Sequence, residues 1–449
     1  MPTGLPLVTP TTVIEAARRA KAASAVLART TTKEKNGALM AVARSLRDHA
    51  GDIFAANRKD LEIARPMVES GEMAESLYRR LKLDEAKLTD IIAGFEQVTA
   101  LEDPIGKVTY AVELDEGLRL YRVNCPIGVV GVVFESRPDA LTQIASLCLK
   151  SGNGVLLKGG READHSNRVL FEIIQSAAAS AGLPSDAMVL LESREDVRSM
   201  LSAEGFVDLI IPRGSNALVS FVQENTNIPV LGHAEGICHI YVDRAADLAK
   251  ALAITIDAKV QYPAVCNAVE TLLVHRDVAP VFLPDVIGRL QDLGVEVRLD
   301  QRAIGQFSIV GAVSATHEDW STEYCDLILS IKVVDSMAEA ITHINTYGSR
   351  HTEAMISEDL AAFDRFFAEV DSAGVYLNAS TRFADGYRYG FGAEVGISTG
   401  KLHPRGPVGL EGLVTYKYKL VGEGHIVTGY TGTSPRRLRH SRLKESEPE

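Results

Sequence analysis

The alternation of short, continuously apolar runs with amphipathic stretches constrains the fold of this chain most strongly. From residue 128 to residue 223, runs of valine, isoleucine and leucine are each followed by a segment with helical periodicity. Strands that are apolar throughout are buried on both faces, which is typical of parallel sheets joined by helices. A second set begins near Ile237, after Pro229 and Gly232, and includes strands around 327–334 and 374–378. The sequence therefore predicts two α/β units that meet near residues 231–235.

Other segments follow different patterns. About the first hundred residues have helical periodicity, and Thr31 and Glu34 have the spacing of a capping box. The segments around 108–124 and 413–421 alternate instead, which indicates protruding strands of a kind that commonly pairs with another subunit. The basic residues from Arg436 onward and the acidic end after them predict a disordered tail.

Composition excludes several classes of function. The 449 residues carry 47 lysines and arginines against 59 aspartates and glutamates, a net charge of −12, which disfavours broad affinity for nucleic acid or anionic lipid. No apolar run approaches the roughly 18 residues that a membrane helix needs, and the opening residues lack the pattern of a signal peptide. Five cysteines without a Cys-x-x-Cys pair favour a reduced protein without a metal site. We therefore expect a cytoplasmic protein with no nucleic-acid or membrane partner.

Cys266 is a candidate nucleophile. Pro263 ends a predicted helix just before it, and an apolar strand follows, so the thiol lies on a turn between two elements. An exposed thiolate is a good nucleophile toward acyl carbons. The alternative is a small buried side chain, since free cysteine is among the most buried residue types. The local pattern leaves both interpretations open.

Two turns that follow predicted strands are candidates for binding a dinucleotide. Lys158 ends one apolar strand and is followed by Gly159 and Gly160, whereas Pro212–Ser215 ends another and opens a helix. The carboxyl ends of parallel strands bind ligands in α/β sheets, and N–H groups at a helix start suit a pyrophosphate. The chain lacks a Gly-x-Gly-x-x-Gly motif, and lysines at strand ends are often merely solvated. A dinucleotide site is therefore a hypothesis that rests on the pair of turns.

Several longer blocks of the sequence resemble the same known family. They are Cys125-Pro-Ile-Gly-Val129, Lys158-Gly-Gly-Arg-Glu-Ala163, Ile211-Pro-Arg-Gly214, Val265-Cys-Asn-Ala268 with Glu270–His275, Asn378-Ala-Ser-Thr-Arg-Phe383 and Gly390–Thr399. Together they resemble the γ-glutamyl phosphate reductases, a branch of the aldehyde dehydrogenase superfamily. The resemblance extends from about residue 14 to about residue 420.

This resemblance implies an aldehyde-dehydrogenase-like α/β fold with two Rossmann-like domains and a protruding β-hairpin for oligomerisation. It implies an NADP-dependent oxidoreductase that reduces L-glutamyl 5-phosphate to L-glutamate 5-semialdehyde, the second step of proline biosynthesis. NADPH is the expected cofactor. The expected partners are further copies in a homodimer or tetramer, with a transient contact to glutamate 5-kinase. The rival hypotheses are an oxidising aldehyde dehydrogenase and a catalytically silent homologue.

The resemblance also divides the chain into parts. These are an N-terminal helical part of the cofactor-binding domain (1–107), an oligomerisation strand segment (108–124), the cofactor-binding domain (125–232), the catalytic domain (233–405), a second oligomerisation strand segment (406–424) and the tail (425–449).

Roles for individual residues follow from the resemblance. Cys266 is the implied nucleophile, and Asn267 is expected near the oxyanion. The implied cofactor contacts are Ser136, Lys158, Gly160, Arg161, Pro212, Gly214, Ser215 and Glu323, with Arg161 suited to a 2′-phosphate. The implied substrate contacts are Arg137, His233, Ser380, Thr381 and Arg382.

Two of these residues depart from the pattern of oxidising aldehyde dehydrogenases. His233 stands where those enzymes carry the glutamate that activates water, and a reductase has no use for that water. Arg137 stands where they carry an asparagine, and its guanidinium fork suits an acyl phosphate or a carboxylate. The alternative role for Arg137 is a structural ion pair with Glu135 or Asp139. Glu323 is likewise either a ribose contact or a solvated loop residue.

Overall fold

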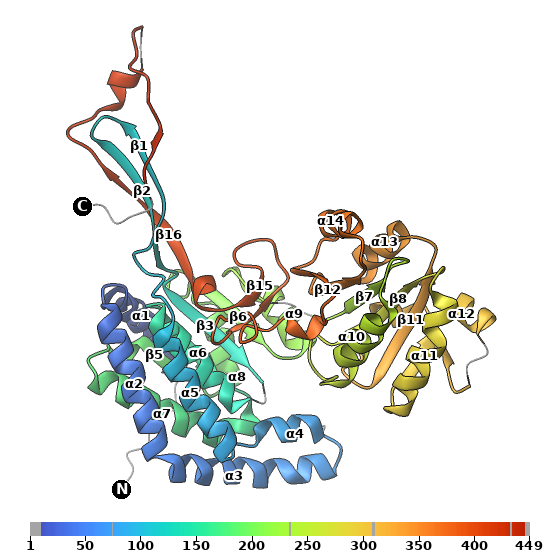
Figure 1. Ribbon diagram of the computed structural model, residues 1–449. Coiled ribbons are helices and arrows are strands. Elements are labelled where there is room, and N and C mark those ends of the chain that lie inside the picture. The colour runs from blue at the N-terminus through green and yellow to red at the C-terminus, as the bar shows by residue number, and fades with distance from the viewer. Residues whose placement is uncertain are drawn as a thin grey trace.

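Two parallel sheets and one protruding antiparallel sheet organise this protein (Figure 1). The computed structural model describes residues 10–73, 75–135, 137–232, 235–307, 310–431 and 433–444. The α/β class predicted from the apolar runs is confirmed. Among the described residues, the helices are either too short or too polar to cross a membrane.

Helices form the N-terminal part, as predicted. They are α1 (Pro10–Leu27), α2 (Thr32–Asp48), α3 (Ala50–Glu69), α4 (Glu75–Leu81) and α5 (Glu85–Ala100). The predicted capping box starts α2: the Thr31 hydroxyl accepts the Glu34 N–H, and the Glu34 carboxylate accepts the Thr31 N–H at 2.8 Å. The buried faces of α2 and α5 belong to the same core as the first parallel sheet.

The first parallel sheet has the order β5-β4-β3-β6. Its strands are β3 (Val129–Phe134), β4 (Gly154–Lys158), β5 (Met188–Leu190) and β6 (Leu209–Arg213). The helices that connect and follow them are α6 (Pro138–Lys150), α7 (Asp164–Ser180), α8 (Arg194–Leu201) and α9 (Asn216–Glu224). The strand order reverses at β3, so the ends of β3 and β6 form the switch point at which such sheets bind ligands.

The second parallel sheet has the order β10-β9-β11-β8-β7-β12-β13. Its strands are β7 (Cys238–Val242), β8 (Val269–His275), β9 (Glu296–Leu299), β10 (Val313–Ser314), β11 (Ile328–Val334), β12 (Thr352–Ile356) and β13 (Gly374–Leu377). Its helices are α10 (Leu248–Val260), α11 (Ala279–Asp292), α12 (Gln301–Gln306), α13 (Met337–Tyr347) and α14 (Leu360–Glu369).

Strand β12 lies inside this sheet, although the apolar pattern did not predict it. It contains Glu353, which is fully buried and interrupts the apolar run. The Glu353 carboxylate accepts the backbone N–H of His239 on the neighbouring strand at 2.7 Å and contacts its Nδ1 at 3.0 Å. A buried polar pairing thus replaces the apolar contact that the pattern would require.

The protruding sheet has the order β16-β2-β1-β17, and Figure 1 shows it extending away from both parallel sheets. It consists of β1 (Val108–Asp115), β2 (Leu118–Pro126), β16 (Val414–Val421) and β17 (Ser441–Arg442). The segment predicted to protrude at 108–124 forms a hairpin of two strands, β1 and β2, and β16 pairs with β2 from Val414 opposite Pro126 to Val421 opposite Arg119. The short pair β14 (Gly396–Ser398) and β15 (Gly406–Val408) precedes β16.

The prediction of a disordered tail is wrong for residues 425–431 and 433–444. Strand β17 pairs with β1, and the Arg439 N–H donates to the Leu114 carbonyl at 2.7 Å. The basic composition that indicated disorder instead matches the acidic tip of the β1–β2 hairpin. Arg439 forms ion pairs with Asp115 at 3.4 Å and with Glu116 at 3.5 Å.

Candidate active site

A cleft of about 1400 Å³ gathers most of the candidate residues. It extends from the carboxyl ends of the strands in the first parallel sheet to the turn between α10 and β8. The candidates that line it are Arg137, Lys158, Gly160, Arg161, Pro212, Gly214, Ser215, Cys266, Asn267, Glu323 and Arg382. Ser136 and His233 lie outside the described residues.

Cys266 lies on the turn that joins α10 to β8, and its side chain is half-buried at the cleft. Contacts from distant parts of the chain hold this turn. Arg80 Nη2 donates to the Ala264 carbonyl at 2.7 Å, and the Cys238 thiol donates to the Cys266 carbonyl at 3.3 Å. Burial keeps Cys238 a thiol by raising its pKa well above the usual value. These two contacts fix the backbone of the turn, and the backbone in turn sets the position of the Cys266 sulfur.

Gly236 packs directly against the candidate nucleophile, Cys266. A Cβ built on Gly236 would lie 2.2 Å from the Cys266 carbonyl oxygen and 2.5 Å from its Cα. Such distances are far inside van der Waals contact, and the obstructing atoms are backbone. Only glycine allows the segment before β7 to approach the Cys266 turn this closely.

Three of the candidate residues, Asn267, Ser380 and Thr381, form hydrogen bonds at and beside this turn. The Asn267 side chain is buried, and its Nδ2 donates to the Ala384 carbonyl at 2.9 Å. Thr381 Oγ1 donates to the Asn267 carbonyl at 2.7 Å, and Ser380 Oγ accepts the Arg382 N–H. Ser380 and Thr381 are buried and do not line the cleft, so the prediction that they face the substrate is not supported by their position. Their hydroxyls are instead used to shape the turn.

Arg382 lines the cleft beside these residues. Its Nε and Nη2 both donate to the Gln261 side-chain oxygen, at 3.0 and 2.9 Å. Burial lowers the pKa of Arg382, and the neighbouring Arg388 adds to that effect. One face of this guanidinium is thus fixed by Gln261, at the start of the turn that carries the nucleophile.

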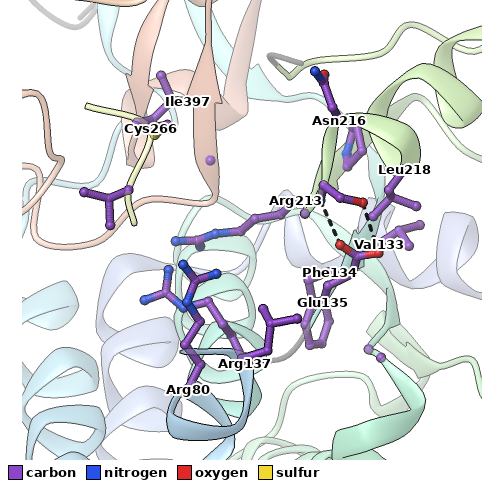
Figure 2. A pocket seen from close by; sticks show the side chains of 18 of the residues that line it. Arg80, Val133, Phe134, Glu135, Arg137, Arg213, Asn216, Leu218, Cys266 and Ile397 are labelled. Atoms are coloured by element: carbon purple, nitrogen blue, oxygen red, sulfur yellow. Dashed lines mark hydrogen bonds between the residues drawn. The ribbon is translucent and has the colours of Figure 1, made fainter. Parts of the chain in front are cut away.

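Three arginines from separate elements converge on the cleft near Cys266. Figure 2 shows the side chains of Arg80, Arg137 and Arg213 pointing toward a common space. Arg80 comes from α4, Arg137 precedes α6, and Arg213 ends β6. Burial lowers the pKa of Arg213, followed by the positive charge of Arg137. Like charges that crowd a cleft favour the binding of an anion.

The contacts of Arg137 bear on its two alternative roles, an anchor for an anionic substrate group and a structural ion pair. Its side chain is 43% exposed, and its Nη2 forms an ion pair with an Asp139 oxygen at 3.6 Å, a distance too long for a hydrogen bond. The Glu135 carboxylate is engaged elsewhere, because it accepts the Ser215 N–H at 2.7 Å. Within the described part of the chain, the long contact with Asp139 leaves most of the Arg137 donors available toward the cleft.

Sequence reasoning did not assign Arg80 and Arg213 to the site. Arg213 belongs to a sequence block that carried the resemblance, and its place at the end of β6 was the available signal. Arg80 had no such signal. Its helix lies far earlier in the chain, and only the tertiary fold places it beside Ala264.

The opposite part of the cleft has the features of an anion site. The start of α9 holds the carboxylate of Glu135 on the Ser215 N–H, so an anion already occupies this helix N-terminus (Figure 2 labels Glu135). Lys158 ends β4, and burial lowers the pKa of its ammonium group. Gly159 must lack a side chain, because the Asn167 amide lies where its Cβ would be. The Lys158 ammonium group and the glycines after it suit the pyrophosphate of a dinucleotide, whereas the Ser215 N–H suits it only when Glu135 is displaced.

A buried ion pair joins the two elements that flank the turn carrying Cys266. Lys259 at the end of α10 donates to Glu270 at the start of β8 at 2.6 Å, and both side chains are almost fully buried. Burial raises the pKa of Glu270 to about 7, and Lys259 opposes that rise. The other Glu270 oxygen accepts the Cys325 N–H at 3.4 Å. The pair thus ties the Cys266 turn to the segment that places Glu323 at the cleft.

Comparison with known proteins identifies the family. The family model described as "Aldehyde dehydrogenase family" matches residues 3–306. The chain belongs to the aldehyde dehydrogenase family. It is 57% identical to a γ-glutamyl phosphate reductase from Synechococcus sp., over 94% of this chain and 92% of that protein.

Solved structures of this family show the same fold. The crystal structure of γ-glutamyl phosphate reductase from Thermotoga maritima matches with a TM-score of 0.88 and 43% identity, covering 92% of this chain and 99% of that one. The glyceraldehyde-3-phosphate dehydrogenase GapN from Methanocaldococcus jannaschii, solved in complex with NADP, matches with a TM-score of 0.66 and 15% identity over 93% and 96% of the two chains. The resemblance to the aldehyde dehydrogenases and the fold it implied are therefore confirmed.

Proposed function

We propose that this chain reduces L-glutamyl 5-phosphate to L-glutamate 5-semialdehyde with release of phosphate, using NADPH, in proline biosynthesis. The observation that carries the proposal is the group of Arg80, Arg137 and Arg213 that faces the cleft near Cys266. Guanidinium groups bind phosphate oxygens in bidentate fashion, so this group suits the phosphoryl end of an acyl phosphate. The γ-glutamyl phosphate reductases that are more than half identical to the chain support the same substrate.

In this mechanism the Cys266 thiolate attacks the γ-acyl carbon. The bond from that carbon to the phosphate oxygen breaks, and a thioester forms on Cys266. The leaving phosphate takes the electron pair and remains beside the arginines, whose positive charge stabilises it. Backbone N–H groups of the turn hold the oxyanion that develops, and loss of one such donor costs about 3–4 kcal/mol. Asn267 contributes by fixing the turn through Ala384.

The cofactor in this proposal is held by the other part of the cleft. Lys158 ends β4, and Gly160 and Arg161 follow it. Pro212 lies in β6, and Gly214 and Ser215 follow that strand. Glu323, from the segment before β11, lines the same cleft. The N–H of Ser215 donates to the Glu135 carboxylate, so a pyrophosphate that binds at this helix N-terminus has to displace Glu135. Ser136 remains in the proposed set. NADPH would supply the hydride that reduces the acyl carbon, and Arg161, which lines the cleft, is the proposed contact for its 2′-phosphate.

An oxidising aldehyde dehydrogenase would need a base to activate water. His233 occupies the corresponding sequence position and remains a proposed substrate contact. Glu235 is the carboxylate nearest to it in sequence, but it accepts the Asn216 side-chain N–H at 2.5 Å and does not line the cleft. Because Glu235 is hydrogen-bonded to Asn216 of α9 and lies outside the cleft, it is not positioned to activate water, which favours reduction of the thioester over its hydrolysis.

Each of the three sheets has a role in the proposed function. The part around the first parallel sheet binds the cofactor, and the part around the second carries the nucleophile. The protruding sheet joins copies of the chain into a dimer or tetramer, and a kinase that makes the labile acyl phosphate contacts the enzyme transiently. A cytoplasmic location stays a prediction.

The reaction is tested in reverse. Purified protein is mixed with NADP⁺, phosphate and glutamate 5-semialdehyde, and NADPH absorbance is followed. We expect NADPH formation that requires phosphate and is abolished by Cys266→Ser, because serine is a far weaker nucleophile. Cys125→Ser is the matched control, since Cys125 lies on β2 away from the cleft, and it should retain activity.

Other outcomes would contradict the proposal. NADPH formation without phosphate would mean that water takes the acyl group, as in an oxidising enzyme. A folded protein with no activity in any direction would support the silent homologue. More than a few per cent of activity in Cys266→Ser would exclude Cys266 as the nucleophile.

A further inference from the structure

A second cavity of about 420 Å³ adjoins the cleft. The two share Gln143, Tyr387 and Ala393 in their walls, so they meet along one boundary. The second cavity is lined from α5 and α6 by polar and charged side chains, among them Lys87 and Asp139. It therefore differs from the cleft proper, whose wall near Cys266 is dominated by arginines.

The proposed substrate carries more than its phosphate. At the other end of a short chain it has an ammonium group and a carboxylate on one carbon. An enzyme that selects this amino acid over a simple acyl phosphate needs an anionic group for the ammonium and a cationic group for the carboxylate. Both must lie near the nucleophile but away from the phosphate.

Most carboxylates near the arginines are already engaged. Glu135, Asp385 and Glu394 each accept a backbone N–H, at 2.7, 2.9 and 2.9 Å respectively. Asp139 differs from them. Its side chain is 17% exposed, it opens into the second cavity, and its ion pair with Arg137 is long, at 3.6 Å. Asp90 also lines this cavity but is exposed to solvent, so the more buried Asp139 is the better placed of the two to bind an ammonium group.

Lys87 provides the opposite charge in the same cavity. Its ammonium group donates to the Arg80 carbonyl at 3.0 Å and is otherwise half-buried, so burial lowers its pKa while Asp139 opposes the change. Arg80 connects the two regions, because its side chain donates to Ala264 on the nucleophile turn. Arg80 thus links Lys87 in the second cavity to the Cys266 turn.

We propose that this cavity is the subsite for the amino-acid end of the substrate, in which Asp139 binds the α-ammonium group and Lys87 binds the α-carboxylate. The inference rests on the proposed function and adds the residues that select an α-amino acid. Arg137 then stands between the two charged ends of the substrate: its free donors face the phosphate, and its long contact with Asp139 marks the boundary.

The test removes substrate groups and protein groups in turn. The reverse reaction is measured with glutamate 5-semialdehyde, with 5-oxopentanoate, which lacks the ammonium group, and with 4-aminobutanal, which lacks the carboxylate. Asp139→Asn should lower kcat/KM about tenfold to a hundredfold for the two aldehydes that carry an ammonium group. It should leave 5-oxopentanoate within about twofold. Lys87→Gln should lower kcat/KM for the two aldehydes that carry the carboxylate and spare 4-aminobutanal.

A second readout does not require turnover. L-Glutamate, glutarate and 4-aminobutyrate carry a carboxylate in place of the acyl phosphate, and each should slow the alkylation of Cys266 by iodoacetamide. Asp139→Asn should weaken protection by L-glutamate and 4-aminobutyrate but not by glutarate. Glu85→Gln is the matched control, because Glu85 is an acidic residue in the first turn of α5 outside both cavities, and it should change neither readout.

The outcomes separate this inference from the proposed function. If the unmodified enzyme is phosphate-dependent but Asp139→Asn affects all ligands equally or none, the subsite is wrong and the function stands. Equal losses with all ligands would make Asp139 a structural residue of α6. If the unmodified enzyme forms no NADPH and no ligand protects Cys266, the proposed function itself fails.

Discussion

Position 236, two residues before β7, has to be glycine, because its Cα lies against the backbone of Cys266. In Gly236→Ala the new methyl group would displace the Cys266 turn, since it cannot occupy the space of the Cys266 carbonyl. A displacement of about 1 Å at a reacting group typically costs on the order of a hundredfold in rate. We expect kcat to fall by about that factor in the assay of NADPH formation.

The control for this change is Gly288→Ala in α11, where an added Cβ meets nothing within 4 Å. That substitution should leave kcat unchanged and stabilise the protein by about 0.5–1 kcal/mol, because alanine is the better helix former. Full activity in Gly236→Ala would show that the turn tolerates displacement and that the close packing has no role in catalysis.

At the scale of single residues, the sequence predicted which residues line the cleft better than it predicted the contacts around them. Cys266 and Lys158 could be found because each follows a regular element whose end the pattern marks. The roles of Ser380 and Thr381 could not be inferred, since burial decides whether a hydroxyl meets substrate or backbone. Arg80 was missed because a long-range contact, not a local pattern, brings it to the site.

Between α10 and β8, the ion pair of Lys259 and Glu270 holds two element ends together. In Lys259→Met the Glu270 carboxylate stays buried without its partner, so the free energy of unfolding should fall by about 3–5 kcal/mol. Replacing both, as in Lys259→Met with Glu270→Leu, should recover much of that loss because no charge is left unpaired. Urea denaturation measures both effects.

The exposed pair of Lys250 and Glu358 serves as the comparison. Its side chains are 49% and 52% exposed, and Lys250→Met should cost less than about 1 kcal/mol. If Lys259→Met costs no more than Lys250→Met, the buried pair does not hold the two elements together.

Elements with regular apolar patterns were predictable, whereas those built on polar contacts were not. The strands of the first parallel sheet are apolar runs and were expected as such. Strand β12 carries a buried glutamate, and β17 joins its sheet through ion pairs with the tip of the β1–β2 hairpin. Both depend on partners that the local sequence does not contain, so no local pattern could indicate them.

The protruding sheet is the feature of the whole molecule that most suggests a second copy. Strand β16 forms its edge, and Tyr416, Tyr418 and Leu420 lie exposed on one face of that strand. An apolar edge of this kind commonly pairs with another chain. Combined Tyr418→Glu and Leu420→Glu substitutions should therefore convert the assembly to single chains, as measured by light scattering during size exclusion.

Phe367→Glu is the control for this experiment. Phe367 is 61% exposed, as Tyr418 and Leu420 are at 60% and 58%, but it lies on α14 rather than on the protruding sheet. It should leave the measured mass unchanged. An unmodified protein that already has the mass of one chain, or an equal effect of both changes, would exclude β16 as the contact between copies.

The pairing of β2 with β16 also determines when this sheet can be completed during translation. Strand β2 leaves the ribosome long before residues 414–421, and at usual elongation rates it waits on the order of tens of seconds for its partner. During that time the hairpin offers a free edge to neighbouring nascent chains. The late arrival of β16 means that a partly synthesised chain lacks the strand that would face a second copy. If copies join through β16, as predicted, that contact is open only to chains in which residues 414–421 have been made.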